Sequence, residues 1–396
     1  MSGRLAVVTH YWAPHVGGIE TVAREQSRRL GQLGWPVGVF TTRLGADAAT
    51  EADGTLAVRR YRCLNWPEQR LRLPVPAPSL RMAADLVSYA RTADVVVAHG
   101  HCYPTSVLAA RAARITGRPL VVIQHNPFVD YPFPLDAVER GVDRTIGRRV
   151  LHQAETVVCV SRHVESYVRA IAPRARTEMI YSGVDTGRFR PGGPRPPDYV
   201  PQTPPFRVLT VRRLVPRNGV DVLIEAWRRF GEPLGERRAA RPEAELIIAG
   251  SGPELPALRR LASGLESVTF TGYVPDDELP GLYRSADVVV VPSVSGEGFG
   301  LVAAEALASG TPVIATTGGA TGEVVRDGTD GLVVEAGNRD ALAGALARLA
   351  ADPARLARMT AAARERGPEL GWDAAIRRLA GVLDAARGTV LEVISS

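Results

Sequence analysis

Apolar runs and helical stretches alternate along the first half of the chain. The apolar runs are rich in valine, isoleucine and leucine and predict buried strands at 5–10, 37–42, 94–99, 119–125 and 156–161. The stretches between them predict helices from about 19 to 33 and near 79–92, 104–116 and 134–153. Strands that alternate with helices in this way predict a parallel, doubly wound sheet.

A second alternating series follows a proline-rich stretch. Its strands are predicted at 207–213, 245–250, 268–272, 287–292, 312–316 and 331–335, and its helices at 219–230, 254–262, 277–284, 299–309, 321–326 and beyond residue 339. The stretch between the two series, 192–205, has six prolines in GGPRPPDYVPQTPP. Such a segment cannot continue a helix or a central strand. We therefore expect one domain at 1–191, a stiff linker at 192–205 and a second domain at 206–371, before a helix at about 372–388.

The composition agrees with two globular domains. A chain of 396 residues is long for one core and suits two domains of about 150–200 residues. The chain has no uninterrupted apolar run of the roughly 18–20 residues that a membrane span needs. The N-terminus leads straight into a strand without the pattern of a signal peptide, so we expect a cytoplasmic protein.

The cysteine spacing and the absence of lysine argue against several classes of chemistry. Cys63, Cys102 and Cys159 are scattered, which argues against a disulfide framework or a structural zinc site. The chain has no lysine, which excludes Schiff-base and pyridoxal phosphate chemistry and a Walker-type P-loop. The net charge is +6, but arginines alternate with acids without a dense basic block. We therefore expect no nucleic-acid partner, while peripheral contact with an acidic membrane stays open.

Residues 287–312 are the most informative segment. A β-branched run ends at Pro292, and the glycine-spaced stretch Gly298-Phe299-Gly300 opens an alanine-rich helix that ends at Gly310. A glycine loop at a helix N-terminus favours anion binding. Glu297 and Glu305 add a carboxylate on each side of this loop, with seven residues between them. Carboxylates beside a phosphate site suit a ligand that also has hydroxyls, such as a nucleotide sugar.

The pattern Glu-x7-Glu within EGFGLVAAEALASGTPVI resembles the donor-site signature of the family-4 retaining glycosyltransferases. The resemblance implies the GT-B fold, an α/β architecture of two Rossmann-like domains with doubly wound parallel sheets that face each other across a cleft. Five further segments resemble family motifs in the same order: GGIE at 17–20, SGVDTGRFRP at 182–191, RLVPRNGVDVLIEA at 213–226, IAGSGP at 248–253 and TFTGYVPDDELPGLYRSAD at 269–287.

The resemblance implies roles for the residues of the donor loop. Glu305 would bind the ribose hydroxyls of the donor, and Glu297 would contact the sugar or stabilise positive charge at its anomeric carbon. The amides of Gly298, Phe299, Gly300 and Leu301 would bind the diphosphate and the donor sugar. The Gly250-Ser251-Gly252 turn would frame the nucleotide pocket, and the backbone at Tyr273 and Val274 would meet the base.

The resemblance also places cations near the diphosphate. Arg213 matches the family arginine, which would neutralise charge on the leaving nucleoside diphosphate. Asn218 stands where the family has a lysine. Two interpretations stay open here: Arg217 supplies the missing charge in a working enzyme, or the activity is reduced or lost.

Histidines follow the strands of the first half. His125 lies where the family places a histidine close to the donor sugar, and it could bind the sugar or assist proton movement. His10, His99 and His101 are candidates for an acceptor pocket. Gly17 and Gly18 would let the first loop approach the phosphates or the acceptor.

These features predict a retaining glycosyltransferase. It would move a sugar from a nucleoside-diphosphate donor, bound by the second domain, to a hydroxyl of a small-molecule or lipid-linked acceptor bound by the first. The terminal helix would pack back on the first domain. We expect no metal and no cofactor, and a front-face reaction, because no further carboxylate stands out as a nucleophile. A nucleotide-sugar epimerase and a non-catalytic nucleotide-sugar-binding protein are the alternatives. The base, the sugar, the acceptor and the oligomeric state stay open.

Overall fold

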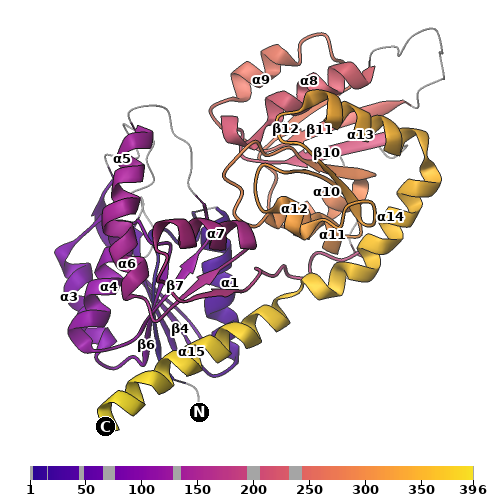
Figure 1. Cartoon of the computed structure of the whole chain (residues 1–396). Coiled ribbons are helices and arrows are strands. Elements are labelled where there is room, and N and C mark those ends of the chain that lie inside the picture. Colours follow the sequence, from indigo (N-terminus) through magenta and orange to yellow (C-terminus); the bar gives the residue numbers. More distant parts are fainter. Residues whose placement is uncertain are drawn as a thin grey trace. The chain divides into compact units, whose positions relative to one another are not determined.

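The chain forms two compact units (Figure 1). The structure is a computed structural model that describes residues 3–15, 17–43, 49–65, 76–127, 135–193, 206–231 and 243–395. The first unit contains Met1–Pro127, Tyr131–Ser182 and Asp373–Ser396, and the second contains Gly183–Trp372. Each unit has one predominantly parallel sheet.

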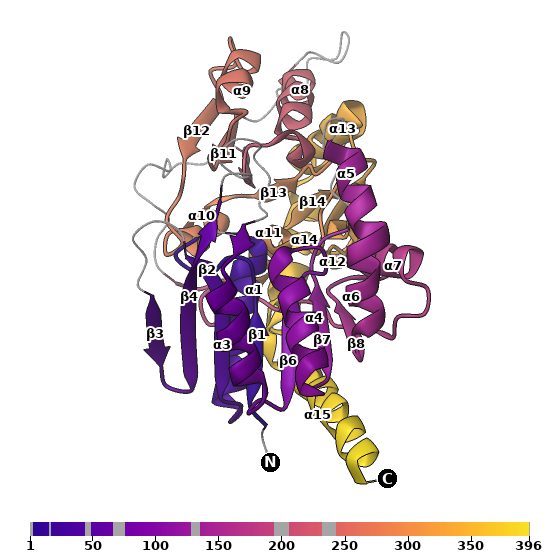
Figure 2. The ribbon, with the colours of Figure 1, turned by 90° about the vertical axis from the view of Figure 1, so that its left-hand side faces the viewer.

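The sheet of the first unit has the strand order β3-β4-β2-β1-β6-β7-β8-β9, and Figure 2 shows most of these strands side by side. Its pairs are parallel except β3 with β4 and β5 with β4. The strands are β1 (Leu5–Val8), β2 (Val37–Arg43), β3 (Thr50–Asp53), β4 (Leu56–Leu64), β5 (Ala77–Pro78), β6 (Val95–His99), β7 (Leu120–Gln124), β8 (Thr156–Cys159) and β9 (Thr177–Met179).

Four of these strands, β3, β4, β5 and β9, were absent from the prediction. In β4, buried positions alternate with partly exposed ones for the first half of the strand, and three arginines interrupt its sequence LAVRRYRCL. Our prediction relied on continuous apolar runs, which indicate a strand buried on both faces. A half-covered strand near a sheet edge lacks such a run.

Helices cover both faces of the first sheet, with α3 and α4 on one side and α1 on the other in Figure 1. The helices are α1 (Gly18–Gln32), α3 (Leu80–Ala90), α4 (Pro104–Thr116), α5 (Leu135–Val142), α6 (Arg148–Gln153) and α7 (Arg162–Ile171). The helix predicted near 134–153 is divided, because a π-helical turn at Asp143–Gly147 separates α5 from α6.

The last helix, α15 (Trp372–Ser395), belongs to the first unit from Asp373 onward. Leu379 and Leu383 are fully buried and, with residues of α1, β1, β6 and β7, line a small cavity. Arg378 pairs with Glu178 of β9 at 2.5 Å. Burial of each leucine contributes about 1.5–3 kcal/mol, so apolar contact attaches this helix to the unit.

The sheet of the second unit is entirely parallel, with the order β12-β11-β10-β13-β14-β15. Its strands are β10 (Phe206–Val211), β11 (Ala244–Ala249), β12 (Val268–Gly272), β13 (Val288–Val291), β14 (Val313–Thr316) and β15 (Gly331–Val334). Its helices are α8 (Val220–Gly231), α9 (Leu255–Leu261), α10 (Leu279–Ser285), α11 (Leu301–Ala308), α12 (Thr321–Val324), α13 (Arg339–Ala351) and α14 (Pro353–Arg366).

Both sheets reverse their strand order at one point. The first sheet reverses between β1 and β6, and the second between β10 and β13. In open parallel sheets, ligands bind outside the carboxyl ends of the strands at this switch point. We therefore expect ligand sites at the loops after β1 and β6 in the first unit and after β10 and β13 in the second.

The second unit begins at Gly183, before the boundary expected at 191. The backbone N–H of Val184 donates to the carbonyl of Leu370 at 2.8 Å. A Cβ atom on Gly183 would lie 2.5 Å from the Cα atom of Trp372, so this segment packs tightly within the second unit. Most of the expected linker, residues 194–205, lies outside the described residues.

Candidate active site

The switch point of the second sheet brings Arg212 and Glu297 together. Arg212 follows β10 and Glu297 lies in the loop after β13, and the Nη2 atom of Arg212 lies 2.7 Å from the Oε2 atom of Glu297. The Ser293 hydroxyl also donates to Oε2, at 3.2 Å. Burial opposes ionisation of Glu297, but the charge and hydrogen bond of Arg212 outweigh it and lower the pKa of the carboxyl. The site therefore holds a carboxylate in a fixed orientation.

Glu305 has different surroundings on α11. Its Oε2 atom accepts a hydrogen bond of 2.8 Å from the hydroxyl of Tyr283, which is fully buried on α10. Burial raises the pKa of Glu305 to about 7, against the effect of this hydrogen bond. Of the two predicted glutamates, one is therefore ionised, and the other titrates near neutral pH.

The loop between the glutamates is held in a tight conformation. Gly300 has φ +92° at the N-terminus of α11, a value that favours glycine. A Cβ atom on Gly319 would lie 2.7 Å from the Cβ atom of Glu297, so the loop after β14 packs directly behind it. The helix begins at Leu301, slightly later than the predicted 299, with Gly298 and the buried Phe299 in the loop before it.

The Gly250-Ser251-Gly252 turn packs against the segment that carries Arg212. A Cβ atom on Gly250 would lie 1.8 Å from the carbonyl oxygen of Arg212, and one on Gly252 would lie 2.2 Å from that of Leu214. Both glycines therefore permit close backbone contact. Ser251 itself is exposed. In the loop after β12, Tyr273 is exposed and Val274 is buried. Their predicted contact with a base stays a prediction.

The three predicted residues of the cation motif, Arg213, Arg217 and Asn218, differ in their contacts. Arg213 is exposed, and its carbonyl oxygen accepts from the Nδ2 atom of Asn218 at 2.7 Å. Asn218 contacts Arg212 through its Oδ1 atom at 2.9 Å. Arg217 lowers the pKa of Glu297 only through its charge, as the smallest of the named causes. The guanidinium that contacts Glu297 thus belongs to Arg212, which the prediction omitted.

The switch point of the first sheet gathers imidazoles around a buried carboxylate. Glu20, in the first turn of α1, lies 3.3 Å from the Nδ1 atom of His15 and 3.9 Å from the Nε2 atom of His10. Burial opposes its ionisation, but the hydrogen bond with His15 and the charge of His10 lower its pKa. A Cβ atom on Gly17 would lie 2.2 Å from this carboxylate, so the first loop passes close to it. Gly18 begins α1.

His99 and His125 form a buried pair at the ends of β6 and β7. The Nδ1 atom of His99 lies 2.8 Å from the Nε2 atom of His125. Burial lowers the pKa of His125 to about 3 and, with His125 and His10 nearby, lowers the pKa of His99 well below its ordinary value. Both rings are therefore neutral near pH 7. They can orient hydroxyls by hydrogen bonding, but they do not carry charge.

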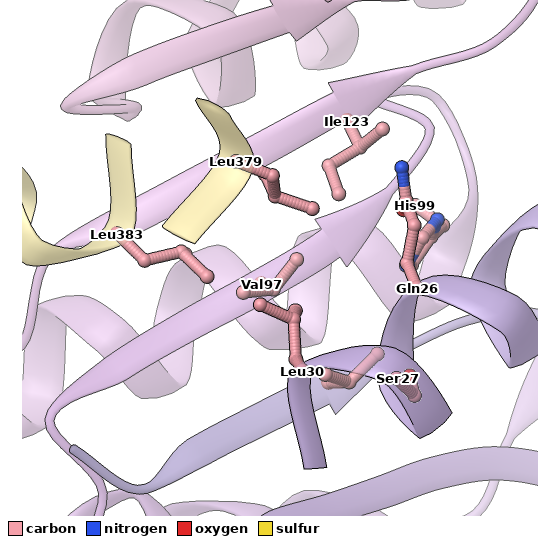
Figure 3. A pocket seen from close by; sticks show the side chains of 9 residues that line it. Gln26, Ser27, Leu30, Val97, His99, Ile123, Leu379 and Leu383 are labelled. Carbon is pink, nitrogen blue, oxygen red and sulfur yellow. The ribbon is translucent and has the colours of Figure 1, made fainter. Parts of the chain in front are cut away.

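A small cavity beside His99 is shown in Figure 3. His99 lines it together with Gln26, Ser27 and the two buried leucines of α15. The buried Oε1 atom of Gln26 and the Oγ atom of Ser27 have no hydrogen-bond partner within the described residues. Two polar atoms in one cavity are the environment that a buried water requires. His99 is fully buried and therefore does not line an open acceptor pocket.

His101 belongs to a separate network. Its Nδ1 atom lies 2.9 Å from the Oε1 atom of Gln124, and its Nε2 atom lies 3.1 Å from a carboxylate oxygen of Asp143. Tyr167 donates to the other oxygen of Asp143. The ligand atoms of His101, Cys102 and Asp143 lie within 4.8 Å of one another, as in a metal site. However, both ring nitrogens of His101 face oxygen acceptors, which favours a hydrogen-bonded structural cluster.

Sequence reasoning missed several residues of both clusters. They are Glu20 and His15 in the first unit and Arg212, Tyr283, Ser293 and Gly319 in the second. Glu20 was within the quoted GGIE, and Gly318-Gly319 follows a strand as Gly17-Gly18 does. These two sequence features could have identified Glu20 and Gly319 as site residues. Tyr283 offered none, because its contact with Glu305 depends on the packing of two helices.

The fold is shared by enzymes of known structure. The chain superposes on sucrose-phosphate synthase from Thermosynechococcus elongatus with a TM-score of 0.78 and 22% identity, covering 98% of this chain and all of that one. It superposes on the Anabaena protein HepE, in complex with UDP and glucose, with a TM-score of 0.75 and 21% identity, covering 97% and 100%. Together with the paired glutamates at the second switch point, the fold is that of a GT-B glycosyltransferase.

Sequence relatives specify the family. Residues 16–188 match the model "Glycosyltransferase Family 4", and residues 196–366 match "Glycosyl transferases group 1". The chain is 34% identical over 389 residues to the GDP-mannose-dependent alpha-(1-6)-phosphatidylinositol monomannoside mannosyltransferase of Mycolicibacterium smegmatis, with 91% of this chain and 92% of that protein covered. It is 31% identical to the D-inositol 3-phosphate glycosyltransferase of Acidothermus cellulolyticus, with 92% and 85% covered.

The chain belongs to glycosyltransferase family 4 and is a retaining glycosyltransferase that uses a nucleotide-sugar donor. The predicted fold, family and activity are thereby confirmed. In the described part of the chain, every helix is too short or too polar to span a membrane.

Proposed function

We propose that the protein transfers mannose from GDP-mannose to a hydroxyl of an acceptor that carries a phosphorylated inositol. Two groups of relatives support this acceptor. One is named for phosphatidylinositol monomannoside and the other for D-inositol 3-phosphate. Phosphorylated inositol is the chemistry that these two names share, and this common feature is the observation that carries the proposal. The donor follows from the first group, which covers more than nine-tenths of this chain.

The first unit has side chains that suit such an acceptor. Inositol presents a ring of hydroxyls, which need both donors and acceptors of hydrogen bonds. His10, His15 and Glu20 offer both at the first switch point, and the neutral His125, which contacts the buried His99, lies at a neighbouring strand end. The N-terminus of α1 adds a partial positive charge for a phosphate.

The second unit has side chains that suit the donor. The Oε2 atom of Glu297 is occupied by Arg212 and Ser293, and its Oε1 atom has no hydrogen-bond partner in the described residues. That oxygen could accept from a hydroxyl of the donor sugar or face the positive charge that develops at the anomeric carbon. Glu305 would accept from the ribose. A nearby guanidinium and the N-terminus of α11 supply positive charge, so we propose that the reaction needs neither a metal nor a cofactor.

The proposal is tested by following transfer with purified protein. We expect mannosylated product from GDP-mannose with phosphatidylinositol monomannoside or inositol 3-phosphate, and much less with unphosphorylated inositol. UDP-glucose serves as the donor control, and EDTA should leave the rate unchanged. Transfer from UDP-glucose in preference to GDP-mannose would refute the donor, and equal transfer to unphosphorylated inositol would refute the acceptor. A rate abolished by EDTA and restored by a divalent metal would refute metal independence.

A further inference from the structure

Arg212 is an unusual residue for its position. It follows β10 directly, its side chain is nearly inaccessible, and its neighbour Arg213 is exposed. The Nη2 atom of Arg212 lies 2.9 Å from the Oδ1 atom of Asn218, 2.6 Å from the hydroxyl of Ser293 and 2.7 Å from Glu297. A buried arginine is costly unless its charge is paired and its donors are satisfied. The charge of this guanidinium is paired with Glu297, and its buried Nε atom has no hydrogen-bond partner within the described residues.

The backbone around Arg212 is held from two sides. On one side, glycines 250 and 252 allow the loop after β11 to touch the carbonyl groups of residues 212 and 214. On the other side, a Cβ atom on Gly219 would lie 2.0 Å from the carbonyl oxygen of Pro292, so the loop after β10 packs on the end of β13. These contacts fix both the residue that carries the guanidinium and Asn218, which accepts from it.

Position 218 explains why the guanidinium is needed there. The motif that residues 213–226 resemble has a lysine at this position, and this chain has an asparagine. The amide of Asn218 is fully used, because Oδ1 accepts from Arg212 and Nδ2 donates to the carbonyl of Arg213. A lysine at 218 would bring an ammonium group close to the guanidinium and would remove the acceptor that orients it. The arrangement therefore accommodates one cation, from either position 212 or position 218.

We propose, building on the proposed function, that Arg212 supplies the positive charge of the donor-phosphate site that a lysine at position 218 would otherwise supply, and that Asn218 is the positioning residue that holds it there. Arg212 has a second effect in this arrangement, since it keeps Glu297 ionised and oriented. Arg217, the substitute suggested by the sequence, makes no such contact within the described residues.

A double-mutant cycle tests whether a cation at position 212 takes the role of a cation at position 218. The variants are Arg212→Met, Asn218→Lys and the two combined, with Arg260→Met on α9 as a control that removes an exposed arginine from the same unit. Binding of GDP, UDP and dTDP is measured by calorimetry, so a wrong base in the proposed donor would leave the test intact. Thermal unfolding is recorded for each variant, to separate loss of binding from loss of fold.

We expect Arg212→Met to weaken binding of the preferred nucleotide by about 10- to 100-fold, as loss of one charge-assisted contact does. Asn218→Lys alone should weaken it by a few-fold, and the combined variant should regain at least ten-fold over Arg212→Met. The critical result is that Asn218→Lys weakens nucleotide binding in the wild-type protein and strengthens it in the Arg212→Met variant. Without Arg212, burial should raise the pKa of Glu297. The acid limb of the pH profile of turnover should therefore move to higher pH in Arg212→Met.

Two results would overturn the proposal and leave the donor site in place. One is an effect of Asn218→Lys that is the same in both backgrounds, because then the two positions do not share a role. The other is an Arg212→Met variant that unfolds at lower temperature but keeps its nucleotide affinity and its pH profile, because then the arginine is only structural. A wild-type protein that binds none of the three nucleotides would overturn the proposal together with the donor site. Preference for UDP or dTDP over GDP would refute only the proposed donor.

Discussion

The switch points of the two sheets each carry a carboxylate, but with different partners. In the second unit, Glu297 is paired with the permanently charged guanidinium of Arg212. In the first unit, Glu20 lies among the imidazoles of His10 and His15. The neighbouring His99 and His125 are neutral, because burial lowers the pKa of each. One switch point therefore has a fixed charge pattern, and the other has mainly hydrogen-bonding groups.

This difference fits two kinds of ligand. A nucleoside diphosphate needs positive charge at its phosphates and acceptors at its hydroxyls, which the second unit offers. A polyol acceptor needs donors and acceptors of hydrogen bonds, which the first unit offers. We infer that the second unit controls charge during the reaction and that the first unit orients the attacking hydroxyl. The following variants test this division.

The largest effect is expected for Glu297→Gln. The amide keeps the shape of the side chain but removes the negative charge opposite the developing positive charge, so turnover should fall by about 100- to 1000-fold. Nucleotide affinity should change by less than about five-fold. The substitution also breaks the ion pair with Arg212, so the free energy of unfolding should fall by about 1–3 kcal/mol.

The matched control for this variant is Glu266→Gln, which changes an exposed glutamate of the same unit. It should leave turnover and the free energy of unfolding unchanged within about 0.5 kcal/mol. A Glu297→Gln variant with near wild-type turnover would remove Glu297 from the reaction and leave it a structural partner of Arg212. The unfolding measurement tests separately whether the ion pair of Glu297 with Arg212 stabilises the second unit.

A smaller effect is expected for His125. His125→Ala should lower turnover by about 5- to 100-fold, because removing one partner of a buried hydrogen bond costs roughly 1–3 kcal/mol. His125→Asn should retain more activity, since an amide can donate and accept without a charge. His152→Ala, at an exposed histidine of α6, is the control. The pKa of His125 is lowered to about 3, so an acid limb near pH 6 that disappears in His125→Asn would contradict a neutral role.

The next effect concerns the pH dependence of donor binding. The pKa of Glu305 is raised to about 7, and only the carboxylate can accept from two ribose hydroxyls. Binding should therefore release a proton below pH 7, and affinity for GDP-mannose should rise about ten-fold from pH 6 to pH 8. Tyr283→Phe removes a donor that favours the ionised form, so the rise should move to higher pH. An equally steep rise in Glu305→Gln would assign it to another group.

The smallest effect is expected for Arg217→Ala. This residue acts on Glu297 through charge alone and contributes less than Arg212. Turnover should fall by no more than about two- to five-fold, and added salt should reduce the difference. Arg260→Ala is the control for removal of an exposed arginine. A fall beyond about 50-fold would mean that Arg217 contacts the donor directly and that charge in the second unit does not come mainly from Arg212.

Much of the fold could be predicted because buried parallel strands have a clear signature. Runs such as Val288–Val291 are apolar on both faces, and glycines mark the turns that follow them. The same reasoning missed β4, where arginines alternate with apolar residues. The glutamates and the strand-end histidines could also be predicted, because a motif or a strand end determines their position.

The partners of those residues could not be predicted. Arg212 and Arg213 are consecutive, so their side chains leave the backbone in different directions, and a motif match could not tell which one is buried. In the structure, Arg212 is the buried one and Arg213 is exposed. Tyr283 lies on α10 and Glu305 on α11, and their contact depends on helix packing. The charge partner of Glu297 and the raised pKa of Glu305 therefore could not be predicted without the structure.

The central claim is acceptor-dependent, retaining transfer from GDP-mannose, and proton NMR of the anomeric signals tests it most directly. The wild-type protein is mixed with GDP-mannose, with and without inositol 3-phosphate or phosphatidylinositol monomannoside. We predict that donor signals disappear only when acceptor is present, that GDP appears in equal amount, and that the new linkage has the α configuration of the donor. A β linkage would contradict retention. Conversion of the donor without an acceptor, or binding without any release of GDP, would contradict a glycosyltransferase.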